Sequence, residues 1–264
     1  MSYFAGIDVG SLSSDAAVID QEGNLQGWSV TETGAHSTNA AEAALDAALA
    51  MAGLGRDDLS FVVATGYGRA AVPLAGKKVT EISCHALGAY SLFPDVGTVI
   101  DIGGQDSKVI RLGAGGKVTD FVMNDKCAAG TGRFLEVMAA KLGVGLDDLG
   151  RLSLAADGEV GISSVCTVFA ESEVVSLVAR NQPIAQIIKG LHRSVVNRVA
   201  AMTGNIGVQP RVIMSGGVAK NAGVVALMAE RLGVEIAVPE EPQIVGALGA
   251  ALMAAREGAQ DRSA

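Results

Sequence analysis

Two cysteines of this sequence lie in segments of small and polar residues. Cys127 lies within residues 124–135, NDKCAAGTGRFL, and Cys166 lies within residues 162–173, ISSVCTVFAESE. Each segment precedes a stretch that we expect to be helical, and the exposed N–H groups of a helix N-terminus stabilise a thiolate or the sulfides of an iron–sulfur cluster. A tetrathiolate cluster needs four cysteines, so one chain offers half of such a site and a two-fold homodimer would complete it. A reactive thiol and a buried cysteine remain alternatives.

The third cysteine and two histidines have a simpler interpretation. Cys84 lies in a stretch that we expect to be helical, and an unligated cysteine is usually a small buried hydrophobe. His85 and His192 have no nearby residues that would complete a metal set, so we interpret both as structural.

Two apolar strands each end in an Asp-x-Gly turn that leads back into a hairpin. The turns are residues 8–14, DVGSLSS, and residues 101–105, DIGGQ. Converging backbone N–H groups of such turns bind phosphate oxygens, and Asp8 and Asp101 could hold a hydrated Mg²⁺. One such turn is more often a structural hairpin, but two at matching places, with a third glycine turn at Gly216 and Gly217, favour a phosphate site. No Gly-x-x-x-x-Gly-Lys-Ser/Thr sequence is present, which excludes a P-loop.

The elements that must position these residues repeat along the chain. The first half predicts strands at 3–9, 16–19, 25–30 and 61–64 and helices at 40–52 and 81–93. The three-strand pattern returns at 98–102, 109–112 and 117–123, and Asp8 aligns with Asp101, which indicates an internal duplication. Further helices are expected at 130–142, 171–180, from Pro183 to about Met202, up to Leu232 and at 246–256, with short strands at 212–214 and 235–238. We therefore predict an α/β chain of two similar lobes, residues 1–95 and 96–264, with a cleft between them and a C-terminal helix, about 246–258, packed back on the first lobe.

Length and charge narrow the possible classes of protein. The chain has 264 residues and a net charge of −8, which disfavours a nucleic acid or an anionic membrane as the main partner. No apolar run reaches the roughly 18 residues of a membrane span, and the first residues lack the pattern of a signal peptide. We expect a cytoplasmic protein with no nucleic-acid or membrane partner, and the odd number of cysteines argues against a disulfide framework.

The three glycine turns resemble those of the actin, heat-shock-70 and sugar-kinase ATPase superfamily. This resemblance implies two actin-like, ribonuclease H-like lobes that bind ATP or ADP with Mg²⁺, which Asp8 and Asp101 would hold, in part through water. It implies phosphate contacts from Asp8, Gly10, Ser11, Leu12, Ser13, Ser14, Gly103, Gly104 and Gln105. It places Gly216 and Gly217 at the adenosine, with Lys220 and Gln243 as further nucleotide-binding residues, and it implies that Asp101 and Gln105 orient the attacking water.

The two cysteine segments resemble the cluster motifs of the 2-hydroxyacyl-CoA dehydratase activators. These proteins, also called archerases, are of the BadF/BadG/BcrA/BcrD type and are related to the ATPase subunits of benzoyl-CoA reductase. The resemblance extends over essentially the whole chain and includes residues 6–11, 64–69, 101–106, 215–221 and 243–251. It implies a homodimer in which Cys127 and Cys166 of both subunits hold one [4Fe-4S] cluster. It also implies an electron donor, ferredoxin or flavodoxin, and a partner dehydratase, to which ATP hydrolysis drives the electron by changing the angle between the cluster-bearing helices.

One position departs from the family pattern. Where the first turn of these proteins commonly ends in lysine, this chain has Asp15, and Lys108 stands at the analogous place of the second hairpin. Three other readings stay open: an ATPase subunit of a benzoyl-CoA reductase, a small-molecule kinase, and an actin-like filament protein. The sequence Gly104-Gln105-Asp106 favours the activator by analogy, and a kinase would leave both cysteines unexplained.

Overall fold

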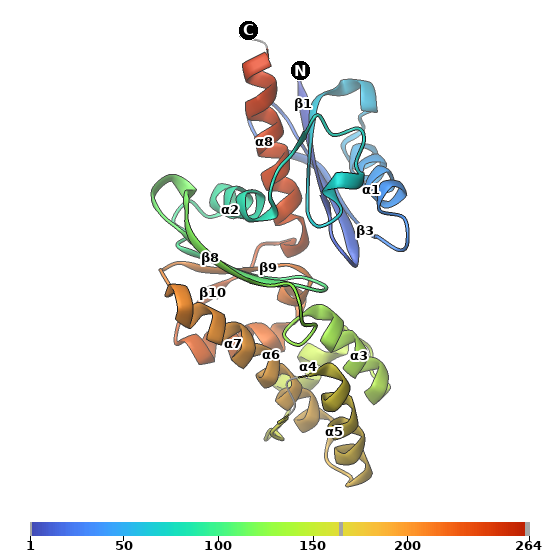
Figure 1. Ribbon diagram of the computed structural model, residues 1–264, viewed down its shortest axis with the longest axis vertical. Coiled ribbons are helices and arrows are strands. Elements are labelled where there is room, and N and C mark those ends of the chain that lie inside the picture. Colours follow the sequence, from blue (N-terminus) through green and yellow to red (C-terminus); the bar gives the residue numbers. More distant parts are fainter. Residues whose placement is uncertain (1, 164–165, 262–264) are drawn as a thin grey trace. The chain divides into compact units, whose positions relative to one another are not determined.

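The computed structural model describes residues 2–163 and 166–261 and divides the chain into two compact units (Figure 1). Unit 1 contains the residues up to Val96, the segment Leu112–Thr119 and the stretch from Glu240 onward. Unit 2 contains Gly97–Arg111 and Asp120–Pro239. The stretch from Glu240 returns the chain to unit 1, so that unit is built from both ends of the sequence.

A mixed sheet forms the centre of unit 1. Its strands are β1 (Tyr3–Val9), β2 (Ser13–Ile19), β3 (Leu25–Glu32), β4 (Leu59–Thr65) and β5 (Lys77–Lys78), in the order β3-β2-β1-β4-β5. β1 runs antiparallel to β2 and parallel to β4. From their second residue onward β1 and β2 are buried throughout, because both faces of the sheet are covered by helices.

The helices of unit 1 are α1 (Ser37–Ala52), α2 (Glu81–Leu92) and α8 (Val245–Asp261). Buried side chains of α1 pack on one face of the sheet, and those of α8 pack on the opposite face together with Cys84 of α2. Glycines allow α8 to approach its neighbours at backbone distance: a Cβ at Gly6 would lie 2.0 Å from the Ala247 carbonyl oxygen, and one at Gly249 would lie 1.8 Å from that of Cys84. The small residues of α8 therefore serve close packing.

The sheet built on β6 repeats the topology of the first. Its strands are β6 (Thr98–Ile102), β7 (Ser107–Leu112), β8 (Val118–Asn124), β9 (Val212–Ser215) and β10 (Ile236–Ala237), in the order β10-β9-β6-β7-β8. β6 pairs antiparallel with β7 and parallel with β9, as β1 does with β2 and β4. The predicted α/β fold with a duplicated strand pattern is thus confirmed, and the duplication includes the parallel strands as well as the hairpins.

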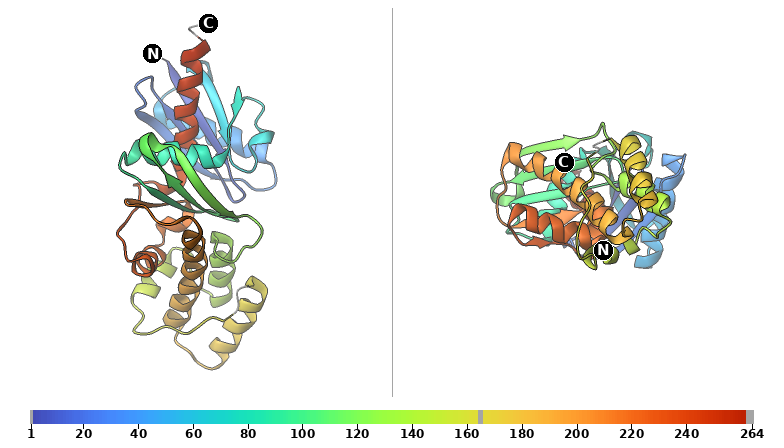
Figure 2. Two further views of the ribbon diagram at one scale, coloured as in Figure 1. Left: turned by 60° about the vertical axis from the view of Figure 1, so that its left-hand side comes forward. Right: turned by 90° about the horizontal axis from the view of Figure 1, so that it is seen from below.

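Five helices complete unit 2: α3 (Gly132–Leu142), α4 (Asp148–Leu154), α5 (Thr167–Ala179), α6 (Ile184–Ile206) and α7 (Ala222–Leu232). α6 follows Pro183, and its apolar residues at 3–4 spacing are buried in one core with residues of α3, α7 and the sheet (Figure 2). Short 3-10 turns lie at Arg56–Asp58, Arg69–Ala71, Ala114–Gly116, Gly217–Lys220 and Pro242–Ile244.

Several element boundaries differ from the sequence expectation. α5 begins at Thr167, directly after Cys166, and not at 171, whereas α3 begins only at Gly132. The sequence did not predict α4 or β5, which are short elements with little periodicity. None of the helices within 2–163 and 166–261 has the combined length and apolarity needed to cross a membrane.

Candidate functional site

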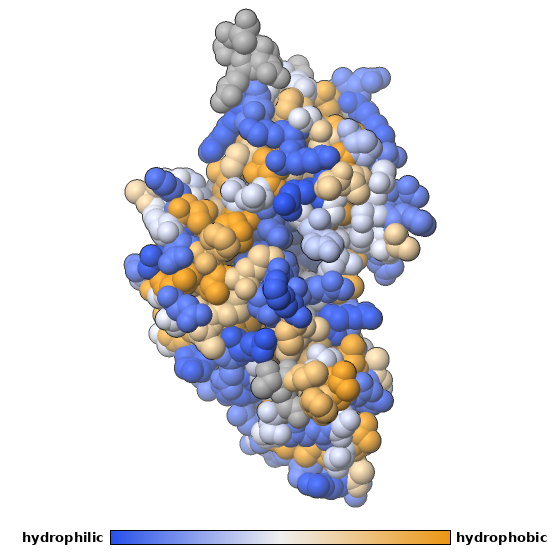
Figure 3. Space-filling model, in the orientation of Figure 1, coloured by the Kyte–Doolittle hydropathy of each residue, from blue (hydrophilic) through white to orange (hydrophobic). Residues whose placement is uncertain are grey.

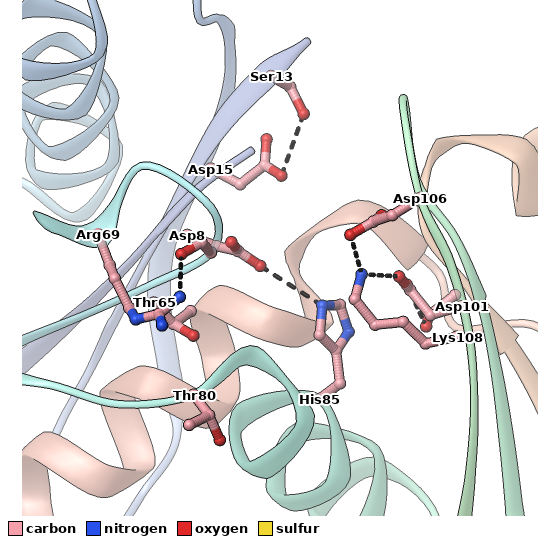
Figure 4. Close-up of polar contacts among 12 residues, drawn as sticks. Asp8, Ser13, Asp15, Thr65, Arg69, Thr80, His85, Asp101, Asp106 and Lys108 are labelled. Atoms are coloured by element: carbon pink, nitrogen blue, oxygen red, sulfur yellow. Dashed lines mark hydrogen bonds and ion pairs between the residues drawn. The ribbon is translucent and has the colours of Figure 1, made fainter. Parts of the chain in front are cut away.

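Asp8 lies near the end of β1 in a tightly built environment of unit 1. It faces Asp15 across the hairpin and Thr65 on β4, and its Oδ2 atom is 3.5 Å from Nε2 of His85 on α2 (Figure 4). A Cβ at Gly246, in the first turn of α8, would lie 2.0 Å from Oδ2, and one at Gly66 would lie 2.3 Å from Oδ1. The carboxylate is therefore confined by His85 and by two glycines that leave room for it.

The β1–β2 turn presents backbone groups next to this carboxylate. The Gly10 N–H donates to the Ser13 carbonyl at 2.9 Å and closes the turn, while the Leu12 carbonyl accepts from Thr33 N–H at 2.9 Å. Gly10, Ser11, Leu12 and Ser13 are half-buried at the tip. Ser14 is fully buried and its hydroxyl lies 2.9 Å from that of Thr33, so this serine is engaged inside the hairpin.

Asp101, in the matching position of β6, is held by a charged partner. Its Oδ2 lies 3.1 Å from Nζ of Lys108, and its Oδ1 accepts the Ser215 hydroxyl at 2.8 Å. Asp106 lies 3.0 Å from the same Lys108 nitrogen (Figure 4). Asp101 and Lys108 are each only 2% exposed. Such a buried pair is tolerated because each charge has a close partner, and the pairing fixes the orientation of Asp101.

The turn from Gly103 to Asp106, which we call the phosphate turn, follows directly. Gly103 N–H donates to the Asp106 carbonyl at 3.0 Å, and the Gln105 side chain is exposed. Gly216 packs against the end of β6 with φ +82°, where a Cβ would lie 2.4 Å from the Ile102 carbonyl oxygen. Only glycine fits such a close approach at positive φ, so the third glycine turn adjoins Asp101.

The remaining predicted nucleotide residues fall in both units. Gly217 and Lys220 are exposed in the 3-10 turn after β9 in unit 2. Gln243 belongs to unit 1, is half-buried, and its N–H donates to the Glu241 carboxylate at 3.1 Å. Each unit thus gathers one group of predicted residues: Asp8 and the β1–β2 turn in unit 1, and Asp101, the phosphate turn and Gly216 in unit 2.

Sequence reasoning missed several residues that contact the two aspartates. His85 and Gly246 contact Asp8 from distant helices, and Ser215 contacts Asp101 from β9. No spacing in the sequence links these residues to the aspartates, because the contacts depend on helix packing and on the parallel strand pair. The contact of Lys108 with Asp101 could have been found by pairing the two strands of the expected hairpin, where it stands opposite Asp101.

The two predicted cluster cysteines are free thiols on loops of unit 2. Cys166 is exposed and is the N-cap residue of α5, with its carbonyl accepting the Ala170 N–H at 2.9 Å. Cys127 is half-buried and lies ahead of α3, so, unlike Cys166, it does not sit at the first turn of a helix as expected. Cys84 differs from both, since it is buried and burial raises the pKa of its thiol to about 12.

A patch of apolar side chains accompanies Cys166. Val168 and Phe169 are each 67% exposed, and Val175 and Val178 of the same helix are also exposed, which gives α5 the apolar surface visible in Figure 3. No group of three or more His, Cys, Asp or Glu side chains able to hold a metal is found within the part of the chain that the structure describes. The thiols present therefore fit a metal centre as a partial donor set of two accessible sulfurs per chain.

The arrangement of turns and thiols can be compared with known proteins. A model of the BadF/BadG/BcrA/BcrD ATPase family matches residues 5–254. The chain belongs to this family. A family member from Anaerotignum propionicum, named activator of lactoyl-CoA dehydratase, is 49% identical over 252 residues, which cover 96% of this chain and 97% of the relative.

Solved structures agree with this membership. The activator of the 2-hydroxyisocaproyl-CoA dehydratase from Clostridium difficile, solved with bound ADPNP, superimposes with a TM-score of 0.95 and 44% identity over 99% of this chain and 97% of that chain. A ROK family glucokinase from Streptomyces griseus, 16% identical with a TM-score of 0.59 over 96% and 99% of the two chains, shares the fold alone. The fold is therefore the actin-like fold predicted from the turns.

A more distant relative bears on the alternative function. A benzoyl-CoA reductase component from Thauera aromatica is 33% identical to this family ATPase over 266 residues, covering 97% of this chain and 94% of the relative. The lactoyl-CoA dehydratase activator is more similar in sequence than this reductase component.

Proposed function

We propose that this protein is an ATP-dependent activator that transfers a low-potential electron to a 2-hydroxyacyl-CoA dehydratase, driven by ATP hydrolysis. The observation that carries the proposal is the pair of accessible thiols, Cys127 and Cys166, in a chain with the turns of an actin-like ATPase. A small-molecule kinase on this fold has no use for these thiols. The dehydratase activators among the relatives support the choice of partner.

The thiols are assigned to a cluster shared by two subunits. Cys127 and Cys166 of each subunit of a homodimer would supply the four thiolates of one [4Fe-4S] cluster. When bound, the cluster accepts one electron from a ferredoxin or flavodoxin and gives it to the dehydratase. The exposed Val168 and Phe169 beside Cys166 offer apolar surface that a second subunit would cover.

The two aspartate turns are assigned to ATP and Mg²⁺. Gly10 to Ser14 and Gly103 to Gln105 would contact phosphate oxygens, and Asp8 would hold Mg²⁺ with Asp101. Because both oxygens of Asp101 already accept hydrogen bonds from Lys108 and Ser215, contact with the cation through water fits better than direct ligation. Asp101 fixes the position of the attacking water, with the exposed Gln105 beside it. Gly216, Gly217, Lys220 and Gln243 are assigned to the rest of the nucleotide.

The second candidate is the ATP-hydrolysing, electron-activating subunit of a benzoyl-CoA reductase. Its support is the more distant relationship to the component of that enzyme from Thauera aromatica. Both candidates use the same cluster and the same ATPase, so they differ only in the partner that receives the electron. Reduced protein with Mg–ATP should activate a 2-hydroxyacyl-CoA dehydratase and leave the catalytic component of a benzoyl-CoA reductase inactive.

The proposal is tested by iron and sulfide analysis of anaerobically purified protein. We expect a brown dimer with about four irons, as a four-thiolate cluster requires. Cys127→Ala and Cys166→Ala should each abolish the cluster while ATP binding persists, because neither residue belongs to the phosphate turns. Cys84→Ala is the matched control, and it should leave iron content unchanged because Cys84 is buried in α2. Absence of iron and of charge-transfer absorption after anaerobic reconstitution would refute the electron-transfer function.

A further inference from the structure

The phosphate turn directly caps the helix that follows Cys127. The first N–H groups of a helix have no partner within the helix, and the N-cap residue of α3, Thr131, makes no side-chain cap. Instead, Gly132 N–H donates to the Gly103 carbonyl at 2.9 Å and Arg133 N–H donates to the Gly104 carbonyl at 2.8 Å. A Cβ at Gly132 would lie 3.2 Å from the Gly103 oxygen, so glycine permits this close approach. The start of α3 is therefore built on the phosphate turn.

Ser107 adds a side-chain link between the same two segments. It is the first residue of β7, directly after the phosphate turn, and its hydroxyl donates to the Gly130 carbonyl at 2.6 Å. Both residues are buried. Gly130 has φ +87°, a conformation that favours glycine, and a Cβ there would lie 2.9 Å from the Arg198 side chain. The Gly130 carbonyl is thus held against Ser107 by a backbone conformation that other residues rarely adopt.

The rest of the Cys127 loop, residues 125–131, is hydrogen-bonded along its length. Asn124 Nδ2, at the end of β8, donates to the carbonyls of Cys127 at 2.9 Å and Ala129 at 3.4 Å. Thr131 donates to the Ala128 carbonyl through both its N–H and its hydroxyl. With the Gly130 carbonyl bound to Ser107, the carbonyls from Cys127 to Gly130 all have partners. The loop is therefore held at two anchors, β8 and the phosphate turn.

We propose that Ser107 is a positioning residue that transmits nucleotide occupancy at the phosphate turn to the Cys127 thiol. This rests on the proposed function, in which the turn contacts nucleotide and Cys127 is a cluster ligand. A nucleotide that shifts the turn shifts Ser107, which follows it in the chain. Ser107 then carries Gly130 with it, and the bonded loop transfers the displacement to Cys127. The Ser107 hydroxyl is the part of this connection that a substitution can remove without changing the backbone.

The test is thiol labelling of the full-length reduced protein before cluster insertion. Alkylation of Cys127 is followed by peptide mass spectrometry with and without Mg–ADPNP. We expect the nucleotide to change the Cys127 labelling rate at least threefold in the unmodified protein. In Ser107→Ala the two rates should differ by less than 1.5-fold, while ADPNP affinity stays within threefold of the unmodified protein. Ser107→Thr, which keeps the hydroxyl, should restore the response.

Ser29→Ala is the matched control. Ser29 is also buried, and its hydroxyl donates to the Ala44 carbonyl at the same distance of 2.6 Å, but within unit 1 and away from the phosphate turn. It should keep the full nucleotide response. Equal loss of the response in Ser29→Ala, or a full response in Ser107→Ala, overturns the proposal.

A measurement on the unmodified protein covers the case in which Ser107→Ala does not fold. Hydrogen exchange should show that Mg–ADPNP alters protection at 103–107 and at 127–133 together. A change confined to 103–107 overturns the inference. Iron content is measured separately, so the coupling can fail while the cluster assignment stands, and the reverse also holds.

Discussion

The β1–β2 hairpin of unit 1 and the β6–β7 hairpin of unit 2 have the same register and opposite charge patterns. Asp8 faces Asp15 across the first hairpin, whereas Asp101 faces Lys108 across the second. Each aspartate also lies beside a glycine at positive φ on the parallel strand's end, Gly66 or Gly216. The backbone of the duplicated unit has thus been kept, while the side chain opposite the aspartate differs.

This difference separates the roles of the two carboxylates. Asp101 has its charge offset by a buried lysine, which suits a group that must keep one orientation. Asp8 and Asp15 form a like-charged cross-strand pair, which is unfavourable by itself and attracts a cation. Asp15 does not point freely into solvent, since it is buried and accepts the Ser13 hydroxyl at 3.2 Å. Unit 1 therefore offers the more negative site for Mg²⁺, and unit 2 offers the more rigid one.

The largest expected effect is that of Asp101→Asn on ATP turnover. The amide keeps the size of the carboxylate and removes the charge that positions water, so turnover should fall by about 100-fold or more while nucleotide remains bound. Asp106→Asn is the matched variant, because it contacts the same Lys108 and leaves the Lys108–Asp101 pair intact. It should lose less than about tenfold. Steady-state hydrolysis assays measure both, and undiminished turnover in Asp101→Asn would remove its assigned role.

Lys108→Met should lower the free energy of unfolding by about 3 to 5 kcal/mol, because it leaves buried carboxylates without their shared cation. Urea unfolding measures the change. Lys77→Met is the control: Lys77 lies 2.8 Å from Glu257 in an exposed pair and should cost less than about 1 kcal/mol. Equal costs for the two variants would contradict the asymmetry between the buried and exposed lysines.

The buried histidines extend the comparison to pH. His192, on α6, contacts the Asn221 side-chain amide at 3.2 Å, and burial lowers its pKa from 6.5 to about 4. Above pH 6.5 the ring is neutral in both states. Between pH 6.5 and 4 the unfolded chain binds a proton that the folded chain does not, so folding loses about 3 kcal/mol over that interval.

His192→Gln should remove this part of the pH dependence, as measured by urea unfolding at pH 7, 5.5 and 4.5. His36→Gln, at an exposed position, should keep it. A difference between protein and His192→Gln that does not vary with pH would show that His192 is not neutral because of burial.

The smallest effect is expected for Asp15→Asn. Removing one of two facing carboxylates should stabilise unit 1 by up to about 1 kcal/mol, since like charges directly opposite are destabilising. Asp15→Lys sharpens the test by giving the first hairpin the charge pattern of the second. If both variants were less stable than the unmodified protein in urea, Asp15 would have a partner more favourable than the repulsion from Asp8.

Local chemistry explains which features could be predicted from the sequence. The hairpins, the Asp-x-Gly turns and the glycine turn at Gly216 follow from short-range patterns, because strand alternation and turn residues act over a few positions. The same holds for the helices that end at Gly53, Gly143 and Gly233, where glycine adopts the left-handed conformation that terminates them. The start of α5 was placed too late, because Thr167 to Ala170 contain β-branched and aromatic residues with weak helix propensity.

The sequence by itself determined the chemistry available to this protein: two aspartate turns and two cysteines in small, polar segments. Only the tertiary structure decided which groups surround them. His85 reaches Asp8 from α2, Ser215 reaches Asp101 from β9, and the phosphate turn caps α3 beyond Cys127. These contacts join residues far apart in the chain, and they exist because parallel strand pairing and helix packing bring distant segments together, which no local pattern encodes.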